Sequence, residues 1–405
     1  MDKLRVLTFT SLYPNAAQPR HGIFTEHRLH SLLATGGVEV RVVAPVPWLP
    51  GFLRGSARFG VYDRVPGSDR RSGIDILHPR YPTLPKVGMT LAPFLMAMAM
   101  LRPLRTLIRG GFDFDVLDAF YLYPDGVAAA LLGRIFGKPV VVTAYGSDVN
   151  VLPNYMLPRA MIRWAARRAS AVTTVSQALK DKLVSLGIPR AKVHVIRHGV
   201  DFRLFAPPAD RAALRARLGM SRPVLLSVGH LIELKGQHIA IEAMSDLPDM
   251  ELWLVGHGEM EARLRAVAEK LGVADRVKFL GHVDQPDLPT YFGAADALVL
   301  ASSREGIPNV ILESMACGTP VVATRVGGVP EVLTAPAAGL LMPERSAEAL
   351  ASTVRALFRD YPDRAATRRF AELFSWTDTA AQHLAVLREV KSRDSGRLLR
   401  PARST

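Results

Sequence analysis

The feature that most constrains the fold is a strand, a glycine-rich turn and a helix that recur along the whole chain. Near the N-terminus, Leu4–Thr10 has the apolar, β-branched composition of a buried strand, Ile23–Ala34 has the pattern of a helix, and Val38–Ala44 has that of the next strand. Apolar strands that alternate with helices are typical of a parallel sheet covered on both faces. The sequence therefore predicts an α/β fold.

The pattern occurs in two series, and Pro207 and Pro208 mark the linker between them. Further strands of the first series are predicted at Val116–Asp118, Pro139–Thr143 and Ala171–Val175, with helices at Gly126–Phe136 and Leu157–Ala169. Strands of the second series are predicted at Val224–Val228, Glu251–Val255, Val277–Leu280, Ala297–Ala301 and Pro320–Ala323. The length of 405 residues suits two doubly wound domains. Such sheets bind ligands at the carboxyl ends of their strands, so we expect a ligand cleft between the two domains.

The net positive charge of the chain lies entirely in its first half. Residues 1–200 carry 26 Lys and Arg against 12 Asp and Glu, whereas residues 201–405 carry 25 of each. This asymmetry indicates that the first half meets a polyanion, such as nucleic acid, anionic lipid or a phosphorylated substrate. A hydrophobic content of 49% excludes a disordered chain.

Cysteine usage and the apolar runs restrict the compartment. A single cysteine, Cys317, excludes an internal disulfide and a cysteine metal cluster. The N-terminus runs into a strand pattern rather than a signal peptide, which predicts a cytoplasmic protein. The apolar run Val87–Leu101 contains Pro93 and is shorter than the roughly 20 residues that a bilayer requires, so no transmembrane span is predicted.

The most specific motif lies in the second series, between Ser303 and Leu333. Glu305 and Glu313 are separated by a turn and by the start of a predicted helix, Val310–Ala316. Backbone amides at such a helix start can bind anionic or hydroxyl-rich ligands, and two carboxylates can accept hydrogen bonds from a polyol. Two glutamates near one helix are more often a solvated face, but the surrounding glycines and prolines favour a site.

This segment resembles the nucleotide-sugar site of family 4 (group 1) retaining glycosyltransferases of bacterial surface-polysaccharide biosynthesis. These enzymes have the GT-B fold, in which two Rossmann-like domains face each other and a C-terminal helix crosses back to the first domain. The resemblance covers about residues 4–390. It implies that Glu313 holds the ribose of the donor. It also implies that Glu305 surrounds the donor sugar together with Gly306, Ile307, Pro308 and Asn309.

Other segments carry the same resemblance. Ser227–Gly236 resembles the loop in which a basic residue and a lysine, here His230 and Lys235, bind the donor diphosphate. His230 stands where the family usually has arginine. The turns that contain Gly256 and, further on, His282 and Val283 resemble those near the nucleotide base. In the first domain, Gly22 would open a helix toward the donor phosphates.

Two departures from the family lie in the first domain. Tyr145 and Phe120 stand where relatives often carry histidine, which shifts weight to Asp148, Tyr145 and the donor's own phosphate oxygen. The resemblance implies Glu305, Asp148 and Lys235 as the candidate catalytic residues. Asp113 and Asp115 spell the D-x-D of metal-dependent transferases, but they lie in a turn where acidic residues are common. The resemblance implies no metal and no other cofactor.

The resemblance divides the chain into four parts. Residues 1–205 form an acceptor-side domain, 206–374 a nucleotide-sugar-binding domain, 375–390 a crossover helix and 391–405 a disordered basic tail.

The function implied is transfer of a hexosyl group, with retention of anomeric configuration, from a nucleoside-diphosphate sugar. The acceptor is a glycan or a polyprenyl-diphosphate-linked glycan. Arginines spaced by three or four residues predict peripheral contact with an anionic membrane at the inner face of the plasma membrane. These are Arg102, Arg105, Arg109, Arg159, Arg163 and Arg167.

Three alternatives stay open. One is a sugar-nucleotide epimerase of the same fold, and another is a non-catalytic GT-B scaffold, which the departures at His230, Tyr145 and Phe120 keep open. The third is a nucleic-acid-binding protein, which is disfavoured because no run of five basic residues occurs, so no nucleic-acid partner is expected.

Overall fold

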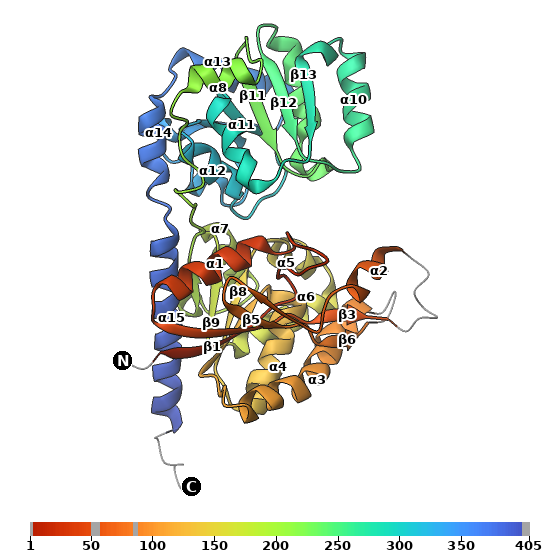
Figure 1. Ribbon diagram of the computed structural model, residues 1–405, viewed down its shortest axis with the longest axis vertical. Coiled ribbons are helices and arrows are strands. Elements are labelled where there is room, and N and C mark those ends of the chain that lie inside the picture. Colours follow the sequence, from red (N-terminus) through yellow and green to blue (C-terminus); the bar gives the residue numbers. More distant parts are fainter. Residues whose placement is uncertain (1–2, 50–56, 84–87, 399–405) are drawn as a thin grey trace. The chain divides into compact units, whose positions relative to one another are not determined.

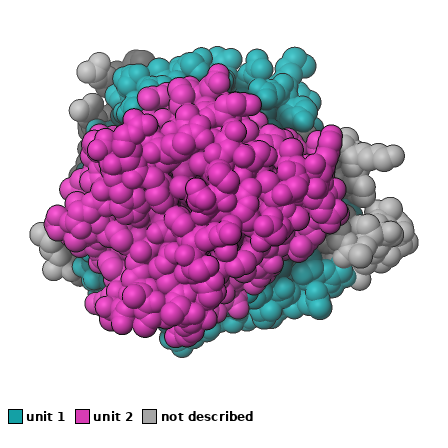
Figure 2. Space-filling model, turned by 90° about the horizontal axis from the view of Figure 1, so that it is seen from above, with its two compact units in different colours: residues 1–197, 377–405 teal, residues 198–376 magenta. Residues whose placement is uncertain are grey.

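The computed structural model describes residues 3–49, 57–83 and 88–398. The chain divides into two compact units. Unit 1 comprises residues 1–197 and 377–405, and unit 2 comprises residues 198–376. Figure 1 labels the elements of each unit, and Figure 2 colours unit 1 teal and unit 2 magenta.

Unit 1 is built on a twisted sheet in the order β10-β9-β8-β7-β1-β2-β5-β4, in which only the β4–β5 pair is antiparallel. Its strands are β1 (Leu4–Phe9), β2 (Val38–Val43), β4 (Ser68–Arg71), β5 (Ile74–Leu77), β7 (Val116–Phe120), β8 (Val140–Ala144), β9 (Ala171–Thr174) and β10 (Val193–Val195). A separate parallel pair joins β3 (Val46–Trp48) to β6 (Arg80–Pro82).

Helices cover both faces of this sheet because successive strand residues point to opposite sides. Leu7 packs in a core with α3, α4, α6 and α7, whereas Val6 packs in a second core with α1 and α15. The helices of unit 1 are α1 (Ile23–Ala34), α2 (Ala57–Asp63), α3 (Gly88–Arg109), α4 (Val127–Phe136), α5 (Ser147–Asn150), α6 (Met156–Arg168), α7 (Gln177–Ser185) and α15 (Trp376–Leu398).

Helix α3 contains one stretch, Thr90–Arg109, that is long and apolar enough to cross a membrane by length and composition alone. Its inner side is fully buried in the first core through Met96, Met100 and Leu104. That packing is what a core helix of a folded unit requires.

Unit 2 holds a fully parallel sheet in the order β13-β12-β11-β14-β15-β16. Its strands are β11 (Val224–Val228), β12 (Glu251–Val255), β13 (Val277–Gly281), β14 (Ala297–Leu300), β15 (Val321–Thr324) and β16 (Gly339–Met342). Its helices are α8 (Arg211–Arg217), α9 (Gln237–Ala243), α10 (Glu261–Lys270), α11 (Leu288–Ala294), α12 (Asn309–Ala316), α13 (Ala347–Arg359) and α14 (Arg364–Ala371).

The strand order of each unit reverses beside its first strand. In unit 2, β12 and β13 lie on one side of β11 and β14 lies on the other, and in unit 1, β2 and β7 flank β1 in the same way. At such a point the loops at the carboxyl ends separate and leave room for a ligand. The two-domain α/β prediction is confirmed, and each unit offers one such edge.

The boundaries differ from those expected from the sequence. The division falls after Arg197 rather than after residue 205, because Val200 donates from its backbone N–H to Phe374 O at 3.0 Å and so joins unit 2. The last helix was expected to end at residue 390, but α15 runs to Leu398, and Lys391 Nζ lies 3.0 Å from Asp115 Oδ1 of unit 1. Residues 391–398 are therefore helical, and the rest of the expected tail lies outside the described residues.

Candidate functional site

Three side chains meet at the carboxyl ends of β11 and β14 in unit 2. Lys235 Nζ lies 2.7 Å from Glu305 Oε1, and the Ser302 hydroxyl donates to the same oxygen at 2.7 Å. The side chains of Lys235 and Glu305 are only 21% and 10% exposed. The sequence identified the lysine and the glutamate separately, and the structure joins them as an ion pair. Partial burial strengthens the field of the ammonium group at this edge.

The loop that carries Lys235 is held by a close backbone approach from the next strand. Gly256 follows β12 with φ of 138°, and a Cβ atom there would lie 1.9 Å from Gly229 O. Only glycine fits such a position. Arg345, which the sequence analysis missed, supports the same region by donating to Ala301 O at 2.8 Å. No local pattern reveals Arg345, because its partner lies far away in the sequence.

A row of three histidines lines the same edge. His230, His257 and His282 each follow a glycine at the carboxyl end of β11, β12 or β13, and the centroids of neighbouring rings lie 5.5 Å apart. All three side chains are exposed. The row arises because these strands are neighbours in the sheet, so His257, which the sequence analysis did not select, joins two that it did. Imidazole N–H groups can donate to phosphate oxygens.

Glu313 lies on α12 and is 8% exposed. Burial raises the pKa of its carboxyl group to about 7, opposed by a hydrogen bond that Gln285 donates at 3.5 Å. A carboxyl group with such a pKa changes its charge near neutral pH. It is therefore poised either to keep its proton or to accept hydrogen bonds from a hydroxyl-bearing ligand.

The turn before α12 combines buried anchors with accessible backbone. Ile307 and Pro308 are buried, so their side chains position the turn, and Gly306 O accepts from Gly328 N at 2.8 Å. Pro308 caps α12 without a side-chain hydrogen bond, and Ile311 N donates to Pro308 O at 3.1 Å, which leaves the amides of Asn309 and Val310 for an anion. Asn309 Oδ1 is buried and has no hydrogen-bond partner within the described part of the chain.

Comparisons with known proteins decide the family. The model of glycosyl transferases group 1 matches residues 210–374, and that of glycosyltransferase family 4 matches residues 23–204. A GDP-mannose-dependent phosphatidylinositol monomannoside mannosyltransferase from Mycolicibacterium smegmatis is 34% identical over 60% of this chain and 68% of its own. The chain belongs to the family 4, group 1 glycosyltransferases.

Further relatives and solved structures agree. A putative teichuronic acid biosynthesis glycosyltransferase, TuaC of Bacillus subtilis, is 29% identical over 87% of this chain and 88% of its own. Sucrose-phosphate synthase from Thermosynechococcus elongatus has a TM-score of 0.75 at 21% identity, covering 97% and 100% of the chains. Anabaena HepE in complex with UDP has a TM-score of 0.71 at 23% identity, covering 96% and 100%. The glycosyltransferase therefore has the GT-B fold.

Unit 1 of this glycosyltransferase places Gly22 at the start of α1. Its φ is 70°, and a Cβ atom would lie 2.2 Å from Leu12 O, so only glycine lets the loop after β1 enter the helix. No side chain caps α1, and the backbone N–H groups of Ile23 and Thr25 donate to Arg20 O at 3.4 Å and to Gly22 O at 2.8 Å.

Asp148, which the sequence predicted as a catalytic residue, lies beneath two loops of unit 1. Its carboxylate is fully buried and accepts hydrogen bonds from the backbone N–H groups of Leu122 at 2.9 Å and Gly146 at 2.7 Å. It thereby joins the loops that follow β7 and β8. Phe120 is fully buried as well, and Tyr145 stacks on it with ring centroids 6.2 Å apart. These three residues shape the loops that follow β7 and β8.

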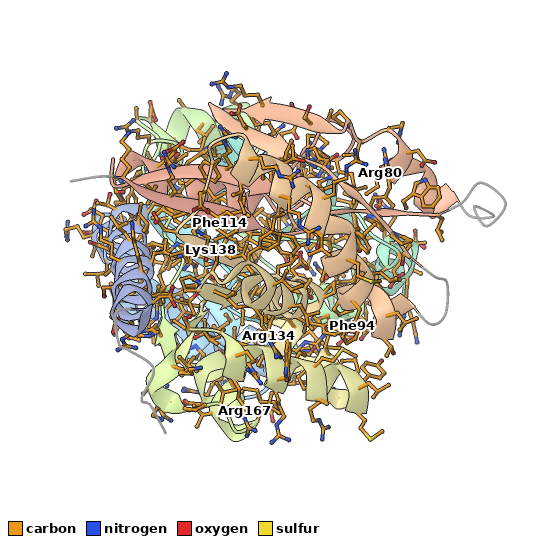
Figure 3. The ribbon with its side chains drawn as sticks, turned by 90° about the horizontal axis from the view of Figure 1, so that it is seen from below. Arg80, Phe94, Phe114, Arg134, Lys138 and Arg167 are labelled. Carbon is orange, nitrogen blue, oxygen red and sulfur yellow. The ribbon has the colours of Figure 1, made fainter. Side chains whose placement is uncertain are left out.

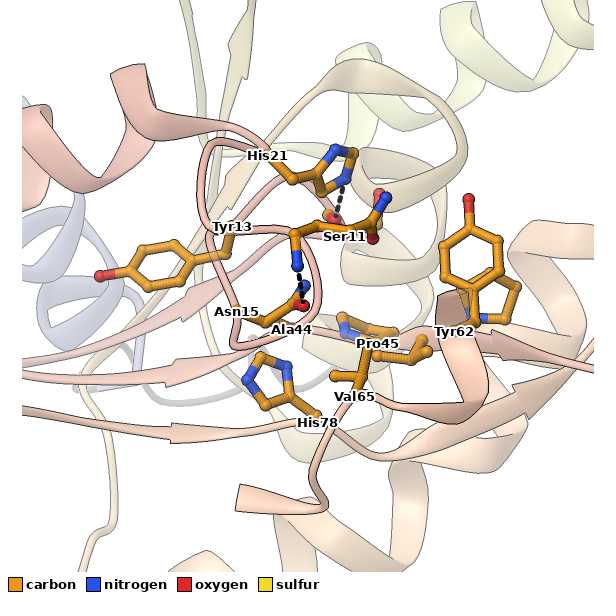
Figure 4. Close-up of a pocket in the computed structure, with 12 residues that line it drawn as sticks. Ser11, Tyr13, Asn15, His21, Ala44, Pro45, Tyr62, Val65 and His78 are labelled. Carbon is orange, nitrogen blue, oxygen red and sulfur yellow. Dashed lines mark hydrogen bonds between the residues drawn. The ribbon is translucent and has the colours of Figure 1, made fainter. Parts of the chain in front are cut away.

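Asp125 is a further acidic residue of the glycosyltransferase that the sequence analysis missed. Both the backbone N–H and the hydroxyl of Ser11 donate to its carboxylate, and burial raises its pKa to about 7. The partners lie on different strand ends, so no local signal joins them. Nearby, His21 Nε2 lies 3.0 Å from Ser11 O at the rim of a cavity of about 20 Å³, which has room for about one water molecule (Figure 4).

Both carboxylates of the D-x-D sequence form ion pairs with lysine side chains. Asp113 Oδ1 lies 2.6 Å from Lys138 Nζ, and Asp115 pairs with Lys391. Among the described residues, no three His, Cys, Asp or Glu side chains are placed to share a metal ion.

Proposed function

We propose that this glycosyltransferase takes a hexosyl group from a nucleoside-diphosphate sugar bound at the carboxyl edge of unit 2, with retention of anomeric configuration. The observation that carries the proposal is the Lys235–Glu305–Ser302 cluster, together with Glu313 on α12 and the start of that helix, which no side chain caps. The cation suits the diphosphate of such a ligand, the carboxyl group of Glu313 suits its ribose, and the amides at the start of α12 suit its sugar.

Lys235 acts on the leaving group. When the bond between C1 and the diphosphate oxygen breaks, negative charge grows on the phosphate and positive charge grows on the sugar. A preorganised ammonium group and aligned amides stabilise the first of these charges. Glu305 keeps Lys235 in place through the 2.7 Å contact. The acceptor hydroxyl bonds to C1 from the same side and gives its proton to the departing phosphate oxygen.

Glu313 binds the ribose. Its ionised carboxylate accepts hydrogen bonds from two hydroxyl groups, which repay the loss of water around the buried charge. The Anabaena HepE structures contain UDP and UDP-glucose, which supports a nucleotide sugar as donor.

The acceptor is a glycan, free or linked to polyprenyl diphosphate, and the enzyme acts on the cytoplasmic side of the plasma membrane. Relatives named for teichuronic acid biosynthesis in Bacillus subtilis and for colanic acid biosynthesis in Escherichia coli support a surface-polysaccharide acceptor.

Calorimetry with UDP-, GDP- and ADP-sugars tests donor binding. Glu313→Ala and Lys235→Ala should each weaken the preferred sugar nucleotide, by about tenfold or more for the loss of a charged hydrogen bond. Glu269→Ala, on the exposed side of α10, is the control. Unchanged affinity in both site variants would refute the assignment.

Proton NMR of the enzyme with donor alone tests the reaction class. We expect the sugar nucleotide to stay unaltered at its ring carbons until an acceptor is added. Conversion without acceptor would establish an epimerase instead, and binding without any turnover would establish a scaffold.

A further inference from the structure

The outward face of α3 is apolar in the N-terminal half of the helix and basic in the C-terminal half. Leu91, Phe94 and Met98 are exposed large apolar side chains, and Met98 is 61% exposed. Arg102, Arg105 and Arg109 continue the line toward the end of the helix, and all three are exposed. Steps of three and four residues keep all six side chains on one face.

Helix α6 repeats this arrangement. Met156 at its start is 80% exposed and Leu157 is exposed beside it. Arg159, Arg163 and Arg167 follow at steps of four and are exposed. Arg167 donates to the carbonyl group of Gly187 at 3.1 Å, so it is bound to backbone rather than to a carboxylate.

The two helices form one surface together with α4. Helix α4 contacts both α3 and α6, and α3 and α6 also contact each other. Figure 3 looks onto this layer from below and labels Phe94, Arg134 and Arg167, which belong to α3, α4 and α6. Ile135, next to Arg134, is exposed. We call the outward side chains of these three helices the α3–α6 surface.

The charge of the α3–α6 surface has a single sign. The three helices contain eight arginines and no Asp or Glu. An ordinary solvated face mixes both signs, whereas exposed Met, Phe and Leu beside uncompensated arginines match the interface of an anionic bilayer. We propose that the α3–α6 surface binds peripherally to an anionic lipid membrane. The apolar side chains enter the headgroup region and the arginines pair with lipid phosphates.

Helix α3 lies on the membrane in this arrangement and does not span it, because Met96, Met100 and Leu104 are buried in the core of unit 1. The direction of the helices gives the surface a function. Since α3 and α6 lead into the starts of β7 and β9, their apolar ends lie toward the carboxyl edge of the sheet. A lipid-linked acceptor would reach that edge directly, and this last step alone rests on the proposed function.

Sedimentation of the full chain with sucrose-loaded vesicles tests the proposal. We expect binding to phosphatidylcholine vesicles that contain phosphatidylglycerol, little binding to pure phosphatidylcholine, and loss of binding between about 50 mM and 500 mM NaCl. Equal partitioning onto both vesicle types would overturn the proposal. So would retention by a DNA duplex in the absence of vesicle binding.

A charge variant with a matched control tests whether the arginines of the α3–α6 surface bind the vesicles. Replacing Arg102, Arg105 and Arg163 by Gln should weaken vesicle binding on the order of a hundredfold, about fivefold for each charge. The control replaces three exposed cations of unit 2, namely Arg217, Arg222 and Lys270. An equal loss in the control would show that net charge alone matters and would overturn the assignment.

The apolar part is tested by Met98→Ser with Met156→Ser, which should weaken binding about tenfold. Leu271→Ser with Leu373→Ser removes exposed apolar side chains from unit 2 and should have no effect. Donor affinity by calorimetry should be unchanged in every variant, which confirms folding. Vesicle binding without any sugar-nucleotide binding would refute the transfer reaction and leave the membrane surface intact.

Discussion

Glu313 has a buried carboxyl group whose ionisation costs folding free energy in the ligand-free protein. Its pKa is about 7 in the folded chain against an ordinary value of 4.5. The folded state therefore holds the proton more tightly than the unfolded state. The cost is absent below the ordinary pKa, grows as the pH rises toward 7 and is complete above 7, where it amounts to about 3 kcal/mol.

Glu313→Gln should remove that cost. We expect the stability of the variant relative to the wild type to increase between pH 5 and pH 7, as measured by urea unfolding at a series of pH values. Glu269→Gln, an exposed replacement on α10, should show no such divergence. Parallel stability curves for Glu313→Gln and the wild type would contradict the raised pKa.

Ionisation of Glu313 should lower the stability of the free protein but raise its affinity for the donor. If the ionised carboxylate accepts the ribose hydroxyls, affinity for the sugar nucleotide should rise between pH 6 and pH 8, across the pKa of about 7. Calorimetry over this range measures it. The rise should vanish in Glu313→Gln, and persistence of the rise in that variant would assign it to another group.

Replacing Gly256 should disturb the neighbouring loop that follows β11. Gly256→Ala places a methyl group 1.9 Å from Gly229 O, so the loop with His230 and Lys235 must move. We expect at least about tenfold weaker donor binding with unit 1 unaffected, measured by calorimetry and by thermal unfolding. Gly272→Ala has open space around its Cβ position but a φ of 67°, so it controls for backbone strain without the collision.

At the scale of elements, α15 completes unit 1 although it follows unit 2 in the sequence. Leu387 is fully buried against the sheet, with Val6 and Val40 in the same core. His383 Nε2 lies 3.1 Å from Asp118 Oδ2, both side chains being fully buried, and burial lowers the pKa of His383. Arg28 Nε donates to His383 Nδ1 at 3.4 Å, so the helix is held by apolar packing and by buried polar contacts.

Leu387→Ala should loosen unit 1 selectively. Deleting a buried leucine side chain costs about 2–5 kcal/mol, because a cavity remains in the core. We expect faster amide hydrogen exchange in peptides from β1 and β7 and unchanged exchange in peptides from β11. Gln382→Ala, on the exposed side of α15, is the control, and equal acceleration in both units would contradict the placement of the helix.

At the scale of the whole molecule, unit 2 is a continuous segment whereas unit 1 is not. A fragment of residues 198–376 should fold on its own and give one cooperative thermal transition. A fragment of residues 1–197 lacks α15 and exposes the apolar residues of the sheet and α1 that α15 covers, so it should bind a hydrophobic dye and melt broadly. Cooperative melting of that fragment without dye binding would refute the role of α15.

Much of this organisation could be predicted from the sequence because it depends on neighbours along the chain. The strands predicted at Val224–Val228 and Glu251–Val255 have the same bounds as β11 and β12 in the structure. The helix predicted at Ile23–Ala34 has the same bounds as α1. The charge asymmetry first suggested a polyanion in general. The structure locates a stretch of arginines on the α3–α6 surface.

Sequence alone determined the two α/β series, the family resemblance and the candidate residues of the donor motif, since periodicity and motif spacing are local properties. Only the tertiary structure decided that Lys235 and Glu305 form one ion pair, that three histidines form a row, and that Asp148 is buried against backbone amides. The physical reason is that strand order determines which distant residues become neighbours, and packing determines which side chains lose contact with water.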